Sequence, residues 1–113
     1  MTSLTKNKCK PCSEKTPKMS MDEIQNKLLE INNWGLNDNK EMLFKKFKFK
    51  SFKKALHFTN LVGEIAAVEG HHPDISLGWG YCLIMIHTHA IKGLSINDFI
   101  LASKIDQIIE QNQ

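Results

Sequence analysis

Residues 51–69 carry the longest helical pattern in the sequence, and strand-like runs flank that pattern on both sides. Two apolar stripes follow it at helical spacing. The first stripe consists of Phe52, Ala55, Leu56, Thr59, Val62 and Ala66, and the second of Phe58, Leu61, Ile65 and Val68. Gly70 is well placed to end the helix. Two stripes predict a helix that covers a sheet and also contacts another helix or another subunit.

Four strands are predicted around this helix, in two hairpin-like pairs. Their ranges are 34–36, 41–50, 74–79 and 81–89, with turn residues within each pair. The phase of the second strand is ambiguous at Lys45-Lys46, where a bulge would fit. The last strand is apolar on both faces from Leu83 to Ile86, which predicts a central or covered strand.

Two further helices are predicted from capping-box patterns. Ser20 to Glu23 opens one helix and Ser95 to Asp98 opens the other. The order is helix, strand, strand, helix, strand, strand, helix, which predicts an α+β fold: a four-stranded antiparallel sheet with three helices on one face. Residues 19–113 form one domain, and the lysine-rich residues 1–18 read as a flexible polar tail.

Composition excludes several classes of protein. A chain of 113 residues is the size of one domain. It has no apolar run long enough for a membrane helix and no secretory signal, so a cytoplasmic location is the simplest expectation. The net charge is +3, and all 15 cationic residues are lysines. Lysines and aromatics alternate over 44–54, as in a single-strand nucleic-acid platform. Without arginine, a solvated strand face is the better interpretation, and no nucleic-acid or membrane partner is expected.

The three cysteines do not predict a disulfide framework. Cys9-Lys10-Pro11-Cys12 supplies two metal ligands at most, and structural zinc needs four. The pair also lies outside any strand–helix context typical of a redox site. No function is assigned to it.

Four histidines fall within residues 71–89, and this group is the best candidate for chemistry. His71-His72-Pro73 follows the central helix, His89 ends the last predicted strand, and Asp98 lies in the first turn of the last helix. If these segments meet, imidazoles and a carboxylate could deliver one proton and remove another. Simpler roles are helix capping for Asp98 and hydrogen bonding within a turn for His89. The same four residues could also ligate zinc or iron, although no His-Glu-x-x-His spacing supports a metal. His87 receives no role.

The motif resembles the pterin-4a-carbinolamine dehydratase family. Resemblance covers about residues 20–110 and rests on spaced motifs: 69–74 (Glu-Gly-His-His-Pro-Asp), Trp79, Thr88-His89, 93–95 (Gly-Leu-Ser) and 97–99 (Asn-Asp-Phe). It implies a lyase that dehydrates 4a-hydroxytetrahydrobiopterin to quinonoid dihydropterin and water, in support of tetrahydrobiopterin recycling. It also implies that no metal or organic cofactor takes part.

The resemblance assigns roles to residues of this chain. His71, His72 and His89 fall on the three active-site histidines; we expect His71 and His89 to transfer protons and His72 to position the pterin. Substrate-binding residues are expected among Asp98, Pro73, Trp79 and Glu69, with Asp98 orienting a histidine or binding the polar edge of the pterin. Ala67 stands where some relatives have an acidic residue, and His87 also departs from the family pattern.

The resemblance also implies partners. We expect a homo-dimer or homo-tetramer, with an aromatic amino-acid hydroxylase supplying the substrate. Some animal relatives of this fold act as dimerisation cofactors for a transcription factor. A non-catalytic interaction module is therefore the alternative, which would not require His71, His72, His89 and Asp98.

Overall fold

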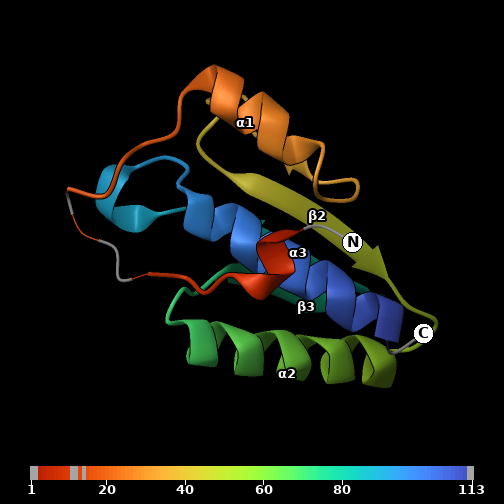
Figure 1. The fold of residues 1–113 in the computed structure, drawn as a ribbon. Coiled ribbons are helices and arrows are strands. Elements are labelled where there is room, and N and C mark those ends of the chain that lie inside the picture. The colour runs from red at the N-terminus through yellow and green to blue at the C-terminus, as the bar shows by residue number, and fades with distance from the viewer. Residues whose placement is uncertain (1–2, 11–12, 14, 112–113) are drawn as a thin grey trace.

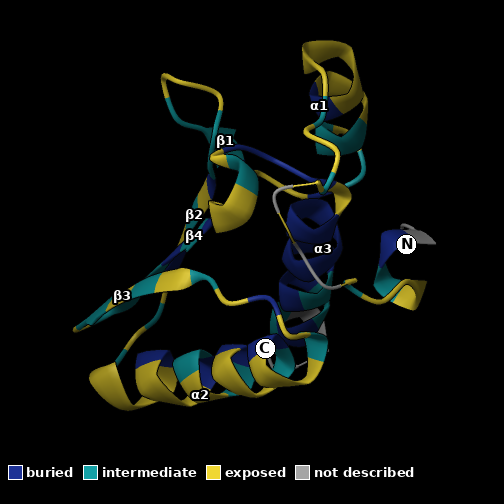
Figure 2. Cartoon of the chain, turned by 90° about the vertical axis from the view of Figure 1, so that its left-hand side faces the viewer, coloured by how far each residue is buried: buried dark blue, intermediate teal, exposed yellow. Residues whose placement is uncertain are grey.

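A computed structural model describes residues 3–10, 13 and 15–111. Four strands form one antiparallel sheet in the order β1-β2-β4-β3; they are β1 (Gly35–Leu36), β2 (Leu43–Lys48), β3 (Asp74–Gly78) and β4 (Tyr81–Ile86). Three α-helices lie to one side of the sheet (Figure 1 and Figure 2); they are α1 (Met21–Leu28), α2 (Phe52–Glu69) and α3 (Ile96–Gln111). The predicted α+β class and element order are confirmed.

The local signals behind the helices are visible in the structure. Ser20 and Glu23 form both hydrogen bonds of a capping box at the start of α1. Ser51 caps α2, where its hydroxyl accepts a hydrogen bond from the Lys54 N–H. Gly70 ends α2 with φ of 66°, a left-handed conformation that glycine adopts without a side-chain clash. No helix among the described residues is both long enough and apolar enough to cross a membrane.

Strand β2 keeps one register with β4 from Leu43 to Lys48, so the strand has no bulge. Leu43 and Phe47 are buried on the core face, while Phe44 is exposed on the other. Lys45 lies on the core face because its ammonium reaches Asp106 of α3, with a distance of 2.8 Å from Nζ to Oδ1. A charged residue on the core face interrupts the alternation of apolar and polar residues along β2. The sequence therefore did not show which face of β2 is buried.

The last predicted strand is shorter than expected. Strand β4 ends at Ile86, and His89–Ile91 form a short 3₁₀ helix. Thr88 still points inward and is buried, and its N–H donates to the Gly93 carbonyl at 2.9 Å. The chain therefore turns back on itself after Ile86, and the prediction of a strand through residue 89 is wrong.

Helix α3 is the centre of the core. Its buried apolar residues point to every side of the helix; they are Phe99, Ile100, Leu101, Ala102, Ile105 and Ile108. Figure 2 shows it as the most continuously buried helix, between the sheet and α2 on one side and the N-terminal segment on the other. Helix α2 instead buries one face and leaves Phe52, Leu56 and Val68 exposed.

The N-terminal segment differs from the expected flexible polar tail in the part that the structure describes. Ser3–Lys6 form a 3₁₀ helix against α3, and Leu4 is only 1% exposed. The Lys10 N–H donates to Asn97 Oδ1, and the Asn97 amide donates to the Lys10 carbonyl. Buried Leu4 and the hydrogen bonds of Lys10 hold this segment against the domain. The lysine-rich composition of the segment did not predict these contacts. Cys12 lies outside the described residues.

Candidate active site

The end of α2 turns His71 into the protein. Beyond the left-handed Gly70, the N–H groups of Gly70 and His71 both donate to the Ala66 carbonyl. The turn directs the His71 ring inward, and His71 is only 7% exposed. Pro73 then fixes the chain as it enters β3. His72 remains exposed beside this buried ring.

Asp98, in the first turn of α3, pairs with the His71 ring. Its Oδ1 lies 2.6 Å from His71 Nε2, and its Oδ2 accepts hydrogen bonds from Thr88 Oγ1 at 2.8 Å and the Ser95 N–H at 2.9 Å. Asp98 is fully buried. The bond from Ser95 is the capping role that the sequence predicts, and the bond to His71 is additional. One carboxylate therefore joins the end of α2, the segment after β4 and the start of α3.

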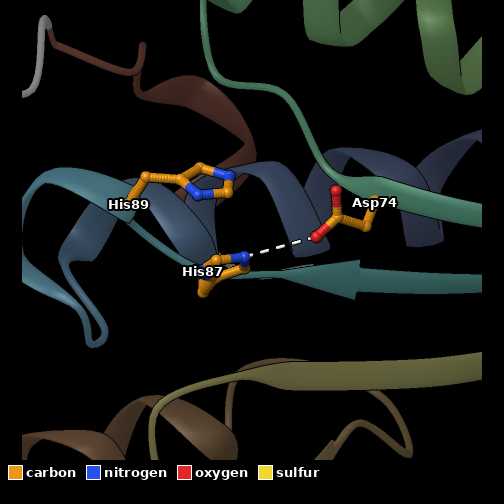
Figure 3. Close-up of side chains that lie close together, drawn as sticks. All are labelled: Asp74, His87 and His89. Carbon is orange, nitrogen blue, oxygen red and sulfur yellow. Dashed lines mark hydrogen bonds and ion pairs between the residues drawn. The ribbon is translucent and has the colours of Figure 1, made fainter.

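His89 directly follows Thr88 in the chain and is exposed to solvent. Thr88, which bonds to Asp98, separates His87 from His89, and the centroids of these two histidine rings are 4.0 Å apart. His87 Nε2 lies 3.3 Å from Asp74 Oδ2 (Figure 3). Because Asp74 pairs with Met85 in the sheet, residues 71–74 lie alongside residues 85–89. The structure thus places the segments that carry His71, His72 and His89 side by side.

Two of the predicted binding residues lie elsewhere. Trp79 is 73% exposed in the turn between β3 and β4. Asp74 marks the opposite end of β3, so Trp79 is roughly 16 Å along the strand from the histidine segments. Glu69 faces the N-terminal segment: its Oε1 accepts the Cys9 N–H at 2.9 Å, and its Oε2 accepts from Lys104 Nζ at 2.7 Å. Glu69 lies two residues before His71 in the chain, but its carboxylate pairs with Lys104 and the Cys9 N–H, whereas Trp79 lies at the far end of β3.

The hydrogen bonds at Glu69 set its charge state. Burial by itself would raise the pKa of Glu69, but the hydrogen bonds from Lys104 and from the Cys9 N–H outweigh burial and hold the pKa below its usual value. Burial and the neighbouring Glu69 carboxylate raise the pKa of the Cys9 thiol to about 12. Cys9 therefore stays a neutral thiol near pH 7, which disfavours a nucleophilic role.

Residues that the sequence analysis did not select complete the arrangement. Thr88 and Ser95 bond to Asp98 and to each other, with 2.7 Å between their hydroxyl oxygens. Asp74 and His87 pair beside His89. Signals for them were present in the sequence: Asp74 follows the His-His-Pro run, and Thr88 separates two histidines. The register of β3 against β4, which brings them together, was not predicted.

The arrangement does not support the metal site first considered. Both oxygens of Asp98 already have partners, and His71 is bound to one of them. The donor atoms that converge within 4.8 Å belong instead to Asp74, His87 and His89. A separate groove lies at the start of α2, lined by Lys50, Lys53, His57 and other residues, and it contains none of these groups. The candidate site therefore consists of the histidine segments around the buried Asp98 carboxylate.

Comparisons with known proteins identify relatives of this chain. The family model described as pterin 4 alpha carbinolamine dehydratase matches residues 17–108. A Rickettsia canadensis protein is 46% identical, covering 96% of this chain and 100% of that one, and a Methylococcus capsulatus protein is 43% identical, covering 94% and 93%. Both are provisionally named pterin-4-alpha-carbinolamine dehydratases.

Solved structures share the fold. A Brucella melitensis protein described as a transcriptional coactivator/pterin dehydratase superimposes with a TM-score of 0.77 at 25% identity, covering 81% of this chain and 98% of that chain. A pterin dehydratase-like protein described as a RuBisCO assembly factor of the alpha-carboxysome gives a TM-score of 0.59 at 23% identity, with coverage of 68% and 89%. The second likeness concerns the fold alone.

Proposed function

The chain belongs to the pterin-4-alpha-carbinolamine dehydratase family, and we propose that it catalyses the dehydration of 4a-hydroxytetrahydrobiopterin. The observation that carries this proposal is the position of Asp98, which bonds both to His71 and to Thr88, the residue before His89. That carboxylate ties the two histidine segments to one place.

The reaction requires two proton movements. The bond from C4a to the hydroxyl oxygen breaks, and a proton delivered to that oxygen lets it leave as water. The N5 proton is removed, and its electron pair forms the C=N bond of quinonoid dihydropterin. Imidazoles suit both steps because their ordinary pKa lies near neutral pH. We assign the two proton transfers to His71 and His89, each contributing about 10²–10⁴-fold.

The neighbouring residues would orient these groups. Asp98 holds the His71 ring in place and, through its bond to Nε2, selects which ring nitrogen carries a proton. Exposed His72, with Pro73 behind it, would position the pterin ring. The substrate contacts expected for Glu69 and Trp79 stay predictions of the resemblance.

The test is a coupled assay. A phenylalanine hydroxylase generates the carbinolamine, and its decay is followed in the ultraviolet with no added protein, with the wild type and with His89→Ala. We expect the wild type to accelerate decay and the variant to lose about 10²-fold or more of that acceleration. His57→Ala, on the exposed face of α2, is the matched control and should retain activity. No acceleration by folded wild type would refute the proposal; full activity of His89→Ala would remove His89 from the mechanism.

Within the cell, the proposed role is tetrahydrobiopterin recycling in the cytoplasm, after an aromatic amino-acid hydroxylase. We also propose that the protein is a homo-dimer or homo-tetramer. Sedimentation should then show no free monomer at micromolar concentration.

One observation favours a second function, that of an interaction module. The apolar side chains of Phe52, Leu56 and Val68 are exposed along α2 in the single chain, and such surfaces commonly bind other proteins. A solved structure with this fold, at 25% identity, is described as a transcriptional coactivator/pterin dehydratase. Absent dehydratase activity together with specific binding by α2 would favour this function.

A further inference from the structure

Asp74, His87 and His89 form a group of metal-binding side chains that the proposed reaction does not use as a unit. One donor atom from each residue lies within 4.8 Å of the other two. Figure 3 shows the carboxylate and the two imidazole rings facing one another beside the end of β4. We propose that these three residues bind one divalent transition-metal ion of the zinc class.

The distances suit such an ion. Zinc lies about 2.0–2.2 Å from nitrogen and oxygen ligands, which puts the ligands of a tetrahedral site roughly 3.3–3.5 Å apart. His87 Nε2 and Asp74 Oδ2 are already 3.3 Å apart. His89 is exposed, so a rotation of its side chain can close the remaining gap of little more than about 1 Å.

The backbone holds the three residues in this relation. Asp74 pairs with Met85, and His87 lies two residues further along, so Asp74 and His87 are diagonal neighbours on one face. Between the histidines, Thr88 is buried and bonded to Asp98 and Gly93. The site therefore rests on a sheet pair and a fixed turn, and its side chains alone adjust to the ion.

The donor set indicates the class of ion. Two imidazoles and one carboxylate suit zinc and its neighbours in the first transition row, whereas calcium and magnesium prefer oxygen ligands throughout. Exposure of Asp74 and His89 leaves a coordination position for water. Without an ion, the contact between His87 and Asp74 is a surface pair of small energetic value, since the Asp74 side chain is 57% exposed.

Binding has one consequence that rests on the proposed function. An ion on His89 would occupy a ring nitrogen that the proposed proton transfer requires. Zinc would then inhibit dehydration, and removal of the ion would restore it. Asp98 and His71 would keep their arrangement, because neither is a ligand of this site.

The experiment measures binding without reference to activity. The full chain, freed of metal with a chelator, is titrated with Zn²⁺ in a calorimeter at neutral pH, and Co²⁺ is added separately to read the visible spectrum. We expect one ion per chain, and an affinity about tenfold or more weaker in His87→Gln and in Asp74→Asn, because each loses a protein ligand. His57→Gln should bind as the wild type does, and thermal melting checks that every variant is folded.

Three results would overturn the site: no binding at micromolar metal, binding unchanged by both ligand variants, or cobalt absorption typical of thiolate ligands, which would assign the ion to cysteine. The dehydratase assay is run in parallel. Inhibition by Zn²⁺ that is relieved in His87→Gln supports the coupling to His89. Confirmed binding with undiminished activity would leave the metal site in place and contradict the assigned role of His89.

Discussion

Asp98 and Asp106 lie about two turns apart on α3, and both are buried carboxylates that hold distant segments together. Asp106 accepts hydrogen bonds from the Trp34 indole, the Asn32 N–H and the Lys45 ammonium. Asp98 accepts them from Thr88 and the Ser95 N–H, and it pairs with His71. Each carboxylate accepts a hydrogen bond from one peptide N–H. The other two partners are an indole and an ammonium at Asp106, and a hydroxyl and an imidazole at Asp98.

The His71 imidazole at Asp98 is the partner that bears on a chemical role. The indole, ammonium and peptide N–H groups around Asp106 act only as hydrogen-bond donors. The partner at Asp98 is an imidazole, the side-chain type most often used as a general acid or base. A buried aspartate on this helix is therefore a means of joining segments, and the proposed function assigns a catalytic use to the Asp98 group because of its histidine. The predictions below test this division.

The largest effect is expected from Asp98→Asn. Asparagine keeps the shape of the side chain but removes the charge, and its amide can donate to His71 where the carboxylate only accepts. We expect kcat/KM for the carbinolamine to fall by about 10²–10⁴-fold, mainly through kcat, because the ring is then held with its proton on the wrong nitrogen. The coupled ultraviolet assay measures both constants. Wild-type kcat in a folded variant would show that Asp98 acts only as a helix cap.

Asp106→Asn is the matched change at the other carboxylate. It leaves the Lys45 ammonium, whose side chain is 15% exposed, without its counter-charge. We expect the free energy of unfolding in urea to fall by about 3 kcal/mol, as for other broken buried ion pairs. Below its melting temperature the variant should retain wild-type kcat/KM. A large loss of activity in fully folded protein would break the comparison, since it would give the Asp106 group a part in the chemistry.

The fold was largely predictable because its signals are local. Helical spacing, serine caps and turn residues define most of the elements, and each acts within a few neighbours. The prediction failed where a contact distant in sequence decides. Lys45 lies on the core face, where its ammonium pairs with Asp106. Leu4 packs on α3, although the sequence that follows it is rich in lysine. β4 ends at Ile86 because the chain turns back to Gly93.

The candidate site was predicted from the sequence to about the same extent as the fold. Residue types and spacing selected His71, His89 and Asp98, and the pair of His71 with Asp98 is present. The parts contributed by Thr88, His87 and Asp74 depend on how β3 aligns with β4. A shift of one residue in that register would turn these side chains to the other face. The two-residue turn Trp79-Gly80 sets this register, and the neighbours of His89 that it brings together were not predicted from the sequence.

Thr88→Val tests the comparison further. It removes one hydrogen-bond partner of Asp98 and leaves the charge of the carboxylate in place. Valine fills the space of threonine but removes the hydroxyl that bonds to Asp98 and to Ser95. We expect unfolding to become easier by about 1–2 kcal/mol, because two buried polar groups lose a partner. The effect on kcat should be about tenfold or less, since the contact of Asp98 with His71 remains. Urea unfolding and the coupled assay provide the two values. A loss of kcat as large as that of Asp98→Asn would mean that the hydroxyl, and not the carboxylate, positions His71.

The smallest effect is expected from Glu69→Gln, which changes a third carboxylate. The partners of Glu69 are the Lys104 ammonium and the Cys9 N–H. The pKa of Glu69 in the folded protein lies below the unfolded value of about 4.3. Its charge therefore contributes stability that is fully present above that pH and is lost as pH falls through the folded pKa. The variant should be less stable by about 1–2 kcal/mol at pH 7, and the difference should shrink on acidification. Urea unfolding across acidic pH, with Glu64→Gln on the exposed face of α2 as control, measures this difference. A pH-independent difference would contradict the ion pair with Lys104, whereas a rise in KM with unchanged kcat would support the substrate contact that the family resemblance implies for Glu69.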